Sequence, residues 1–148
     1  MKIVLLHPEN LQRQVLQFML EQAGFEVHVV TGLSRLRREI LSSRPTCLIA
    51  LEDGEYRQQC ELFGELRELE FDGPILVLAP EPNVDSELLA FQSGADDYMG
   101  SPVDPTVLIA RLTRINARTV RDRRRSARRD APSHSRPAKD HTGNREER

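Results

Sequence analysis

The sequence predicts an α/β domain in which helices cover both faces of a doubly wound, five-stranded parallel sheet. Short apolar runs of strand length alternate along the first 120 residues with longer segments of helical periodicity. This alternation is the pattern of βαβ units, which build parallel sheets. Right-handed crossovers then place helices on both faces of the sheet, so that the domain has three layers.

Each strand is predicted from a short apolar or alternating run. The first reads "KIVLL" and the second, "FEVHVV", alternates in the manner of a strand with one more exposed face. The remaining runs are "TCLIAL", "PILVLA" and "DDYM". The five predicted strands are therefore 2–6, 25–30, 46–51, 74–79 and 96–99.

The segments between the strands have helical spacing. The first predicted helix follows Asn10, a suitable N-cap, and stops at Gly24. Its apolar residues recur with helical periodicity: Leu11, Val15, Phe18 and Met19. Further helices are expected over 33–43, 55–70 and 84–93. The last begins at Pro105, a residue favoured at the first helical position, and runs at least to Val120.

Charge divides the chain into two parts. Residues 1–110 carry 8 Lys and Arg against 18 Asp and Glu, whereas residues 111–148 carry 13 against 5. After Val120 the sequence has no aromatic residue and almost no large aliphatic one, so it cannot bury enough apolar surface to order itself. We therefore expect a domain over 1–120 and a basic, disordered tail over 121–148, the first half of which extends the last helix in one interpretation.

Several classes of protein are disfavoured by composition. The apolar runs are too short to cross a bilayer, and the N-terminus lacks the features of a signal peptide, which indicates a cytoplasmic protein. Cys47 and Cys60 lie in apolar patterns and are expected to be buried free thiols. No cysteine or histidine cluster has the spacing of a zinc site, and we expect no metal or cofactor.

Three stretches carry a resemblance to a known family. "KIVLLHPENLQRQVLQFMLEQAGFEV", "RPTCLIALED" and "GPILVLAPEPNVDSELLAFQSGADDYMGSPVDPTVLIARL" resemble parts of response-regulator receiver domains, most closely those of winged-helix transcriptional regulators. The resemblance covers roughly residues 2–118. It implies the flavodoxin-like receiver fold, with strand order 2-1-3-4-5, and a place in two-component signalling.

The same resemblance implies a phosphorylation site, which this sequence lacks. Receivers use an acceptor aspartate, an acid pair that helps to hold Mg²⁺, a hydroxyl residue and a lysine, because the transferring group carries negative charge. The corresponding positions here are Pro8, Glu9, Leu51, Ala79 and Ser101. We therefore expect a pseudo-receiver that is not an enzyme, does not accept a phosphoryl group and acts by binding a protein partner. The Ser101–Pro102 bond is expected to be cis, as it commonly is in receivers.

Other interpretations remain open for the polar residues near these positions. Glu52 and Asp53 are solvated loop residues, or Asp53 is a displaced acceptor that keeps some phosphotransfer. Glu9 is solvated, or it holds a weak Mg²⁺ site. His7 is interpreted as a residue at a strand end and His28 as an exposed strand residue.

The last strand and helix contain the residues for which the resemblance implies a switch and an interface. Tyr98 takes the position of the aromatic residue that changes rotamer on activation, and we expect it to be fixed by packing here. Asp97 and Arg111 take positions that form salt bridges across a dimer face in transcription-factor receivers, or they pair within one chain. Glu87 and Val107 depart from the charge pattern of that face, and Val107 adds an apolar contact.

The arginines that follow the start of the last predicted helix are regularly spaced. Steps of three and four place them along one helical face: Arg111, Arg114, Arg118, Arg121, Arg125 and Arg128. The stripe is a solvated extension, or it makes weak, salt-sensitive contacts with nucleic-acid phosphates, since no aromatic residue is present to stack on bases.

Overall fold

The predicted three-layer architecture is confirmed. The computed structural model describes the backbone of residues 1–130 and the side chains of residues 1–118. Its five strands form one parallel sheet in the order β2-β1-β3-β4-β5. The strands are β1 (Lys2–Leu6), β2 (Glu26–Val30), β3 (Cys47–Leu51), β4 (Ile75–Ala79) and β5 (Asp97–Gly100).

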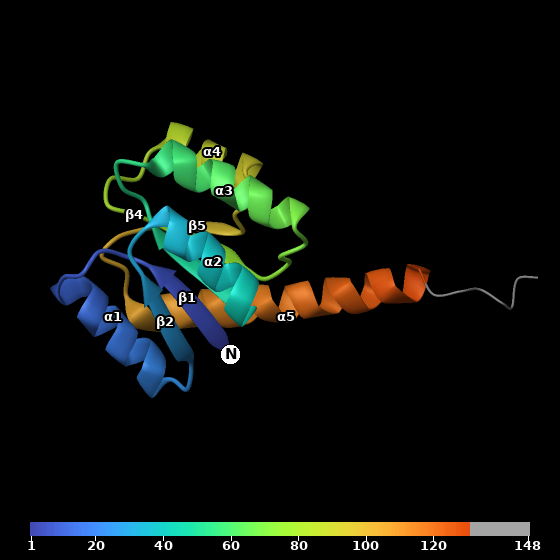
Figure 1. Cartoon of the computed structure of the whole chain (residues 1–148). Coiled ribbons are helices and arrows are strands. Elements are labelled where there is room, and N and C mark those ends of the chain that lie inside the picture. Colours follow the sequence, from blue (N-terminus) through green and yellow to red (C-terminus); the bar gives the residue numbers. More distant parts are fainter. Residues whose placement is uncertain (131–148) are drawn as a thin grey trace, which may run out of the picture.

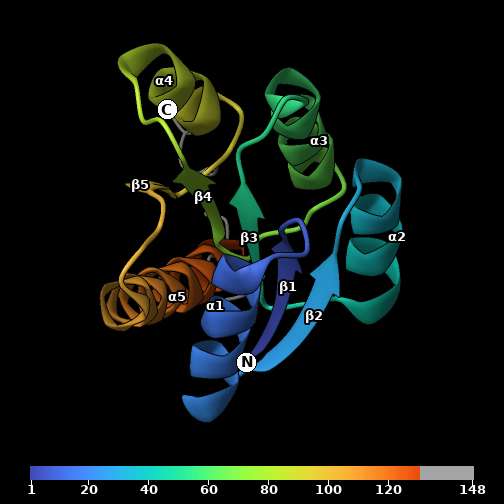
Figure 2. The same ribbon diagram turned by 90° about the vertical axis from the view of Figure 1, so that its left-hand side faces the viewer.

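Five helices cover the two faces of this sheet. They are α1 (Leu11–Gln22), α2 (Leu33–Ser43), α3 (Tyr56–Glu68), α4 (Val84–Gln92) and α5 (Pro105–Asp130). Helices α1 and α5 lie on one face, and α2, α3 and α4 lie on the other (Figures 1 and 2). Because every strand runs in the same direction, the loops that follow all five strands meet along one edge of the sheet, which we call the carboxyl edge.

Each face of the sheet has its own hydrophobic core. On the side of α2, α3 and α4, Leu36 and Phe63 are fully buried against the strands. On the side of α1 and α5, Leu20 and Leu108 are fully buried. The central strands β3 and β4 are buried along their whole length, as expected for parallel strands covered on both faces.

Helix α1 is present as predicted, but it buries a different face. Leu16 and Leu20 point into the core. The residues whose spacing predicted the helix are instead largely exposed, with relative accessibilities of 73%, 51%, 58% and 38% in the order Leu11, Val15, Phe18 and Met19. The helix is apolar on two faces, and the spacing of its apolar residues alone does not decide which one packs on the sheet.

Helix α5 continues well beyond the expected domain boundary at residue 120. It runs unbroken to Asp130, so the first ten residues of the expected disordered tail are helical. The physical reason is that arginine and alanine are good helix formers, and the first proline after Pro105 is Pro132. The rest of the expected tail, 131–148, lies outside the described residues.

Arg67, at the end of α3, connects the loops that lead into β4 and β5. Its guanidinium donates hydrogen bonds to the carbonyl oxygens of Gly94, Phe71 and Gly73 at 2.7–3.1 Å. It also pairs with the Asp96 carboxylate at 2.9 Å. That carboxylate accepts a hydrogen bond from the N–H of Ile75, the first residue of β4. Gly94 has φ of +113°, and a Cβ there would lie 2.9 Å from the Arg67 Cγ, so glycine is required for this contact.

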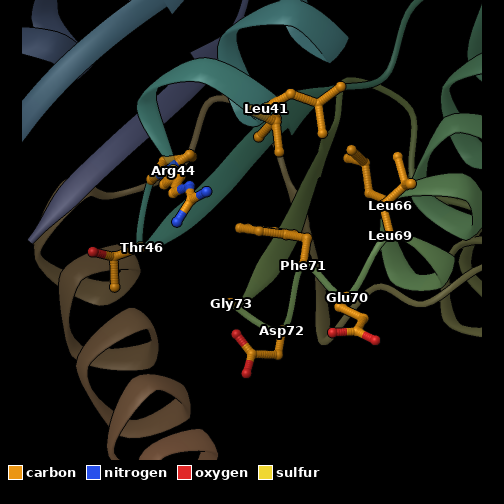
Figure 3. A pocket seen from close by; sticks show the side chains of 11 residues that line it. Leu41, Arg44, Thr46, Leu66, Leu69, Glu70, Phe71, Asp72 and Gly73 are labelled. Atoms are coloured by element: carbon orange, nitrogen blue, oxygen red, sulfur yellow. The ribbon is translucent and has the colours of Figure 1, made fainter.

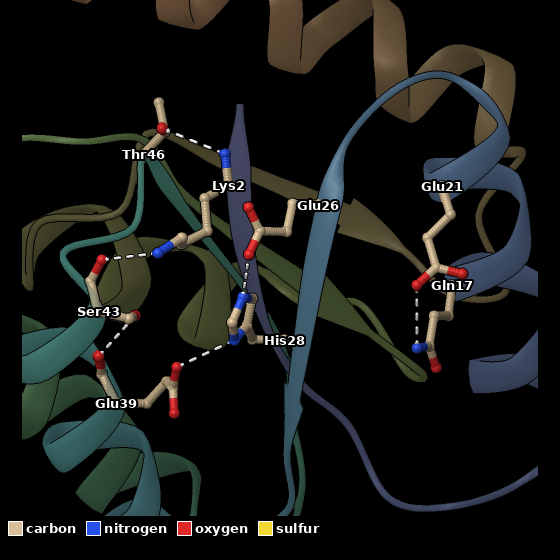
Figure 4. A network of polar contacts seen from close by, with 8 residues as sticks. All are labelled: Lys2, Gln17, Glu21, Glu26, His28, Glu39, Ser43 and Thr46. Carbon is tan, nitrogen blue, oxygen red and sulfur yellow. Dashed lines mark hydrogen bonds and ion pairs between the residues drawn. The ribbon is translucent and has the colours of Figure 1, made fainter.

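A second polar network holds β1 and β2 to α2 (Figure 4). The Lys2 ammonium donates to the Ser43 carbonyl at 3.0 Å. His28 contacts Glu26 through Nε2 at 2.7 Å and Glu39 through Nδ1 at 3.2 Å. The hydrogen bond from His28 lowers the pKa of the Glu26 carboxyl. His28 is therefore not the simple exposed strand residue that the sequence suggested, because it bridges β2 and α2.

Two smaller predictions are confirmed. Cys47 and Cys60 are free and buried, as expected. The Ser101–Pro102 peptide bond is cis, as expected. Among the described residues, no helix is both long enough and apolar enough to cross a membrane.

Replacing Arg67 with methionine is predicted to lower the free energy of unfolding by about 2–4 kcal/mol, because three partly buried carbonyl groups and Asp96 lose their charged donor. Arg37→Met is the matched control, since Arg37 also leaves one helix to pair with a carboxylate, that of Glu65, but is half exposed. The free energy of unfolding of Arg37→Met should fall by less than about 1 kcal/mol. Urea unfolding monitored by circular dichroism measures both values, and equal losses would contradict the role assigned to Arg67.

Candidate functional site

The carboxyl edge is apolar at the positions that the resemblance assigns to phosphoryl transfer. Leu51 is the last residue of β3 and Ala79 the last of β4, and both are buried. Ser101 lies beside them, since its N–H donates to the Ala79 carbonyl oxygen at 2.8 Å. The fold therefore brings the three positions together, with a methyl and an isobutyl group where a receiver site presents oxygen atoms.

The loop after β1 adds no carboxylate to this surface. Pro8 and Glu9 are exposed, and 75% of the Glu9 side chain is accessible. The Glu9 carboxylate lies 3.8 Å from the guanidinium of Arg13 on α1. Arg13, of which 15% of the side chain is accessible, is a cation beside this loop that was not identified from the sequence.

His7 follows β1 directly and is almost completely buried, at 2% accessibility. Its N–H donates to the Val30 carbonyl oxygen, and its ring Nδ1 contacts the Pro8 carbonyl oxygen at 3.0 Å. Because a carbonyl oxygen only accepts, Nδ1 carries the proton. Burial lowers the pKa of this imidazole, with a smaller contribution from the charge of Arg13, so the ring is held in its neutral form.

An apolar cavity of about 240 Å³ lies next to His7, between α1 and the loop after β5. Its walls include Leu11, Val15 and Val103, and its polar lining groups are those of His7, Gln12 and Ser101. None of its lining residues is an aspartate, glutamate, lysine or arginine. This cavity suits an apolar group and offers no charge to a phosphate.

Leu51 and Glu52 point to opposite faces of the sheet. Leu51 packs with Leu78 and Met99 in the core on the side of α1 and α5. Glu52 instead reaches Ser86 and Tyr98, on the side of α3 and α4. This is the alternation expected of successive residues at a strand end. The apolar cavity and the polar network described next therefore occupy different sides of the same edge.

The Glu52 carboxylate, in the loop after β3, contacts helix α4 and strand β5. One of its oxygens accepts from the Ser86 hydroxyl at 3.1 Å, and the other accepts from the Tyr98 hydroxyl at 3.4 Å. The Tyr98 oxygen also accepts from the Asn83 N–H at 3.3 Å. The Tyr56 hydroxyl donates to the Ser86 carbonyl oxygen at 2.5 Å. We call these five residues the Glu52 network.

Tyr98 is fixed by this network in a buried position. Only 8% of the residue is accessible. Burial is the main cause that raises the pKa of its hydroxyl, and the neighbouring Glu52 carboxylate acts in the same direction. Burial likewise raises the pKa of Tyr56. Both hydroxyls therefore stay protonated and able to donate at neutral pH.

Asp53 has a structural role at the start of α3. Its carboxylate accepts from the Glu55 N–H at 2.8 Å and from the Gln59 amide at 3.2 Å. Gln59 is buried, and its amide also donates to the Leu51 carbonyl oxygen at 3.0 Å. Both donors bind the same carboxylate oxygen, Oδ1, so Asp53 fixes the loop that enters α3.

Within residues 1–130, no cluster of three or more histidine, cysteine, aspartate or glutamate residues has a geometry that could ligate a metal. Glu9, the only member of the expected acid pair that is a carboxylate, is turned to Arg13.

Known proteins place the domain in a family. No protein-family model matches the chain. The chain is 28% identical over 119 residues to the phosphate regulon transcriptional regulatory protein PhoB of Pseudomonas aeruginosa. The matched region covers 79% of this chain and 52% of PhoB. It is 30% identical over 118 residues to the transcriptional regulatory protein QseB of Haemophilus influenzae, which covers 76% of this chain and 51% of QseB. The chain thus spans about half the length of the curated relatives that it matches.

A solved structure agrees with these relatives. A CheY-like response regulator receiver domain protein from Methanospirillum hungatei superposes with a TM-score of 0.74 over 82% of this chain and 97% of that one, at 15% sequence identity. The chain is a response-regulator receiver domain. Its strand order and its five helices are those that the sequence led us to expect.

The face made by α4, β5 and α5 of this receiver carries both charged and exposed apolar side chains. Arg111 pairs with Asp97 of the same chain, with 3.2 Å between Nη1 and Oδ2, which is the intramolecular alternative. Glu87 lies exposed on α4. Four apolar side chains on α4 and α5 are 42–69% exposed, namely Val84, Leu88, Phe91 and Val107.

Several residues of the receiver site were not identified from the sequence. They are Arg13, Gln59, Asn83 and Ser86. Asn83 precedes a helix and accepts from the Ser86 N–H, so its capping role was recognisable from its place in the sequence. Gln59 and Arg13 gave no signal, because polar residues in a helix are usually on the solvent side.

Proposed function

We propose that this chain is a pseudo-receiver, which binds a protein partner in a two-component-type signalling or regulatory system without accepting a phosphoryl group. The single observation that carries the proposal is the Glu52 network. A carboxylate of the chain itself accepts from the hydroxyl of Tyr98, the residue at the switch position, and from Ser86 in α4. The Glu52 carboxylate thus already supplies a hydrogen-bond acceptor to Tyr98, the residue that would respond to phosphorylation in a receiver.

The replaced positions support the same proposal. Leu51 has no oxygen to phosphorylate, and Ala79 and Ser101 supply neither the usual hydroxyl nor the usual cation. With serine at the lysine position, a phosphoryl group at this edge would lack its usual ammonium partner and would lie next to an apolar cavity, where its desolvation would be costly. The alternative, residual phosphotransfer to Asp53, needs a carboxylate that is free to react, whereas that of Asp53 is engaged by Glu55 and Gln59.

We further propose that α4, β5 and α5 form the partner-binding face, with a second copy of the chain as one partner. Val84, Leu88 and Phe91 recur at helical spacing on α4, and Val107 extends the patch to α5. Because the Asp97–Arg111 pair closes within one chain, apolar contact rather than that pair would drive association.

A second candidate function is electrostatic binding of nucleic acid through α5. The observation that favours it is that α5 continues as one helix to Asp130, which leaves the domain (Figure 1). Arginines recur along it at steps of three and four residues, and neutralising phosphates with such a stripe gives weak, salt-dependent binding.

Incubation with acetyl phosphate and Mg²⁺ is expected to leave the intact mass of the protein unchanged, because the acceptor position is leucine. A receiver with an intact acceptor aspartate, treated in parallel, shows that the donor is active. A gain of one phosphoryl group that disappears in Asp53→Asn would instead establish the residual acceptor and contradict the proposal.

The α4 patch is tested with Leu88→Glu, which places a charge in the proposed interface and should weaken homodimer formation by about tenfold or more. Val15→Glu is the matched control, since Val15 on α1 is 51% exposed and Leu88 is 52% exposed. Sedimentation equilibrium measures the dissociation constants. A wild type that stays monomeric, or equal effects of the two substitutions, would count against the proposed dimer face.

A further inference from the structure

A second cavity lies at the opposite edge of the sheet from the Glu52 network. It has a volume of about 620 Å³ and lies between the ends of α2 and α3 and the loops that enter β3 and β4 (Figure 3). The five residues of β3 separate it from the carboxyl edge by roughly 16 Å. We call it the α2–α3 groove, and neither the receiver resemblance nor the proposed function assigns it a role.

The floor of the groove is apolar and partly open. Ile40 and Leu66 are buried beneath it. Phe71 stands between the two helices, and Leu41 and Leu69 line the groove from either helix, each 49% exposed. A side chain placed here would remove these apolar surfaces from water, which is favourable at about 25 cal/mol per Å².

Three charged residues line the groove, namely Asp72, Arg44 and Glu70, and the last two have an unusual backbone. Arg44 ends α2 with φ of 49°, and Glu70 follows α3 with φ of 68°. Glycine adopts this left-handed conformation at lower cost than other residues. The chain therefore carries a long charged side chain at two positions where glycine would be the less strained choice. Within the described part of the chain, neither side chain has an ion-pair or hydrogen-bond partner.

The placement of these charges indicates what the groove can bind. Arg44 lies on the side of α2, Glu70 lies on the side of α3, and Phe71 lies between them (Figure 3). We propose that the groove binds a short peptide segment of a partner protein, with a large apolar side chain on the floor. An acidic residue on one side of that anchor pairs with Arg44, and a basic residue on the other side pairs with Glu70. Opposite charges on the two sides would fix the direction of the peptide.

A random dodecamer library displayed on phage and selected on the full chain tests this proposal. The wild type should select peptides with one large apolar residue between an acidic and a basic residue in a constant order. The double variant Arg44→Glu/Glu70→Arg should select the reverse order. Swapping the exposed Arg37–Glu65 pair, which lies outside the lining of the groove, is the control and should leave the selected order unchanged.

Glycine substitutions separate binding from folding. Arg44→Gly and Glu70→Gly suit the left-handed backbone, so the melting temperature should stay the same or rise. Each should nevertheless lower the affinity for a selected, fluorescently labelled peptide by about tenfold or more, as measured by fluorescence anisotropy. The absence of any common peptide pattern, a pattern that survives the charge reversal, or full affinity in both glycine variants would overturn the proposal.

Discussion

The arrangement of the carboxyl edge depends on the hydrogen bonds that the Glu52 carboxylate accepts. Glu52 lies one residue beyond β3 and accepts from Ser86 on α4 and from Tyr98 on β5. Hydrogen bonds to a carboxylate are about twice as strong as bonds between neutral groups, and burial increases their strength. Removing this acceptor would leave the Ser86 hydroxyl without its bond and the buried Tyr98 hydroxyl without an acceptor, so α4 and β5 would lose their common attachment to the centre of the sheet.

The two sides of this edge have complementary properties. On the side of α1, Leu51 packs in the core, Leu78 and Ser101 line an apolar cavity, and the buried His7 is held neutral. On the side of α4, a charged carboxylate is satisfied by hydroxyl donors. Alternation along β3 produces the contrast, since Leu51 and Glu52 must face opposite sides. The polar contacts that hold Ser86 and Tyr98 therefore come from the face opposite to the one on which Leu51 packs.

Much of the fold could be predicted from the sequence, and the limits have physical causes. Alternating apolar runs and helical segments determine a parallel sheet, and the predicted strands that end at Leu51 and Ala79 end there in the structure. The buried face of α1 could not be predicted, because Leu16 and Leu20 compete with Leu11, Val15 and Phe18 for the same periodicity.

Contacts between segments that are distant in the sequence could not be predicted either. Arg67 resembles any surface arginine until the loops before β4 and β5 are placed around it. Glu52 was interpreted as a solvated loop residue because its partners lie 34 and 46 residues away along the chain. In both cases the decisive information is the distance between loops in the folded domain, which neither spacing nor composition contains.

The central claim is that Glu52 holds the switch region in one state, and backbone ¹⁵N relaxation dispersion measures this directly. The wild type should show flat dispersion profiles from Asn83 to Gly100, because a single conformation is populated on the microsecond-to-millisecond timescale. In Glu52→Ala the same amides should show exchange, whereas Glu81→Ala, in the exposed loop after β4, should not. Exchange of equal amplitude in the wild type and Glu52→Ala would contradict the claim.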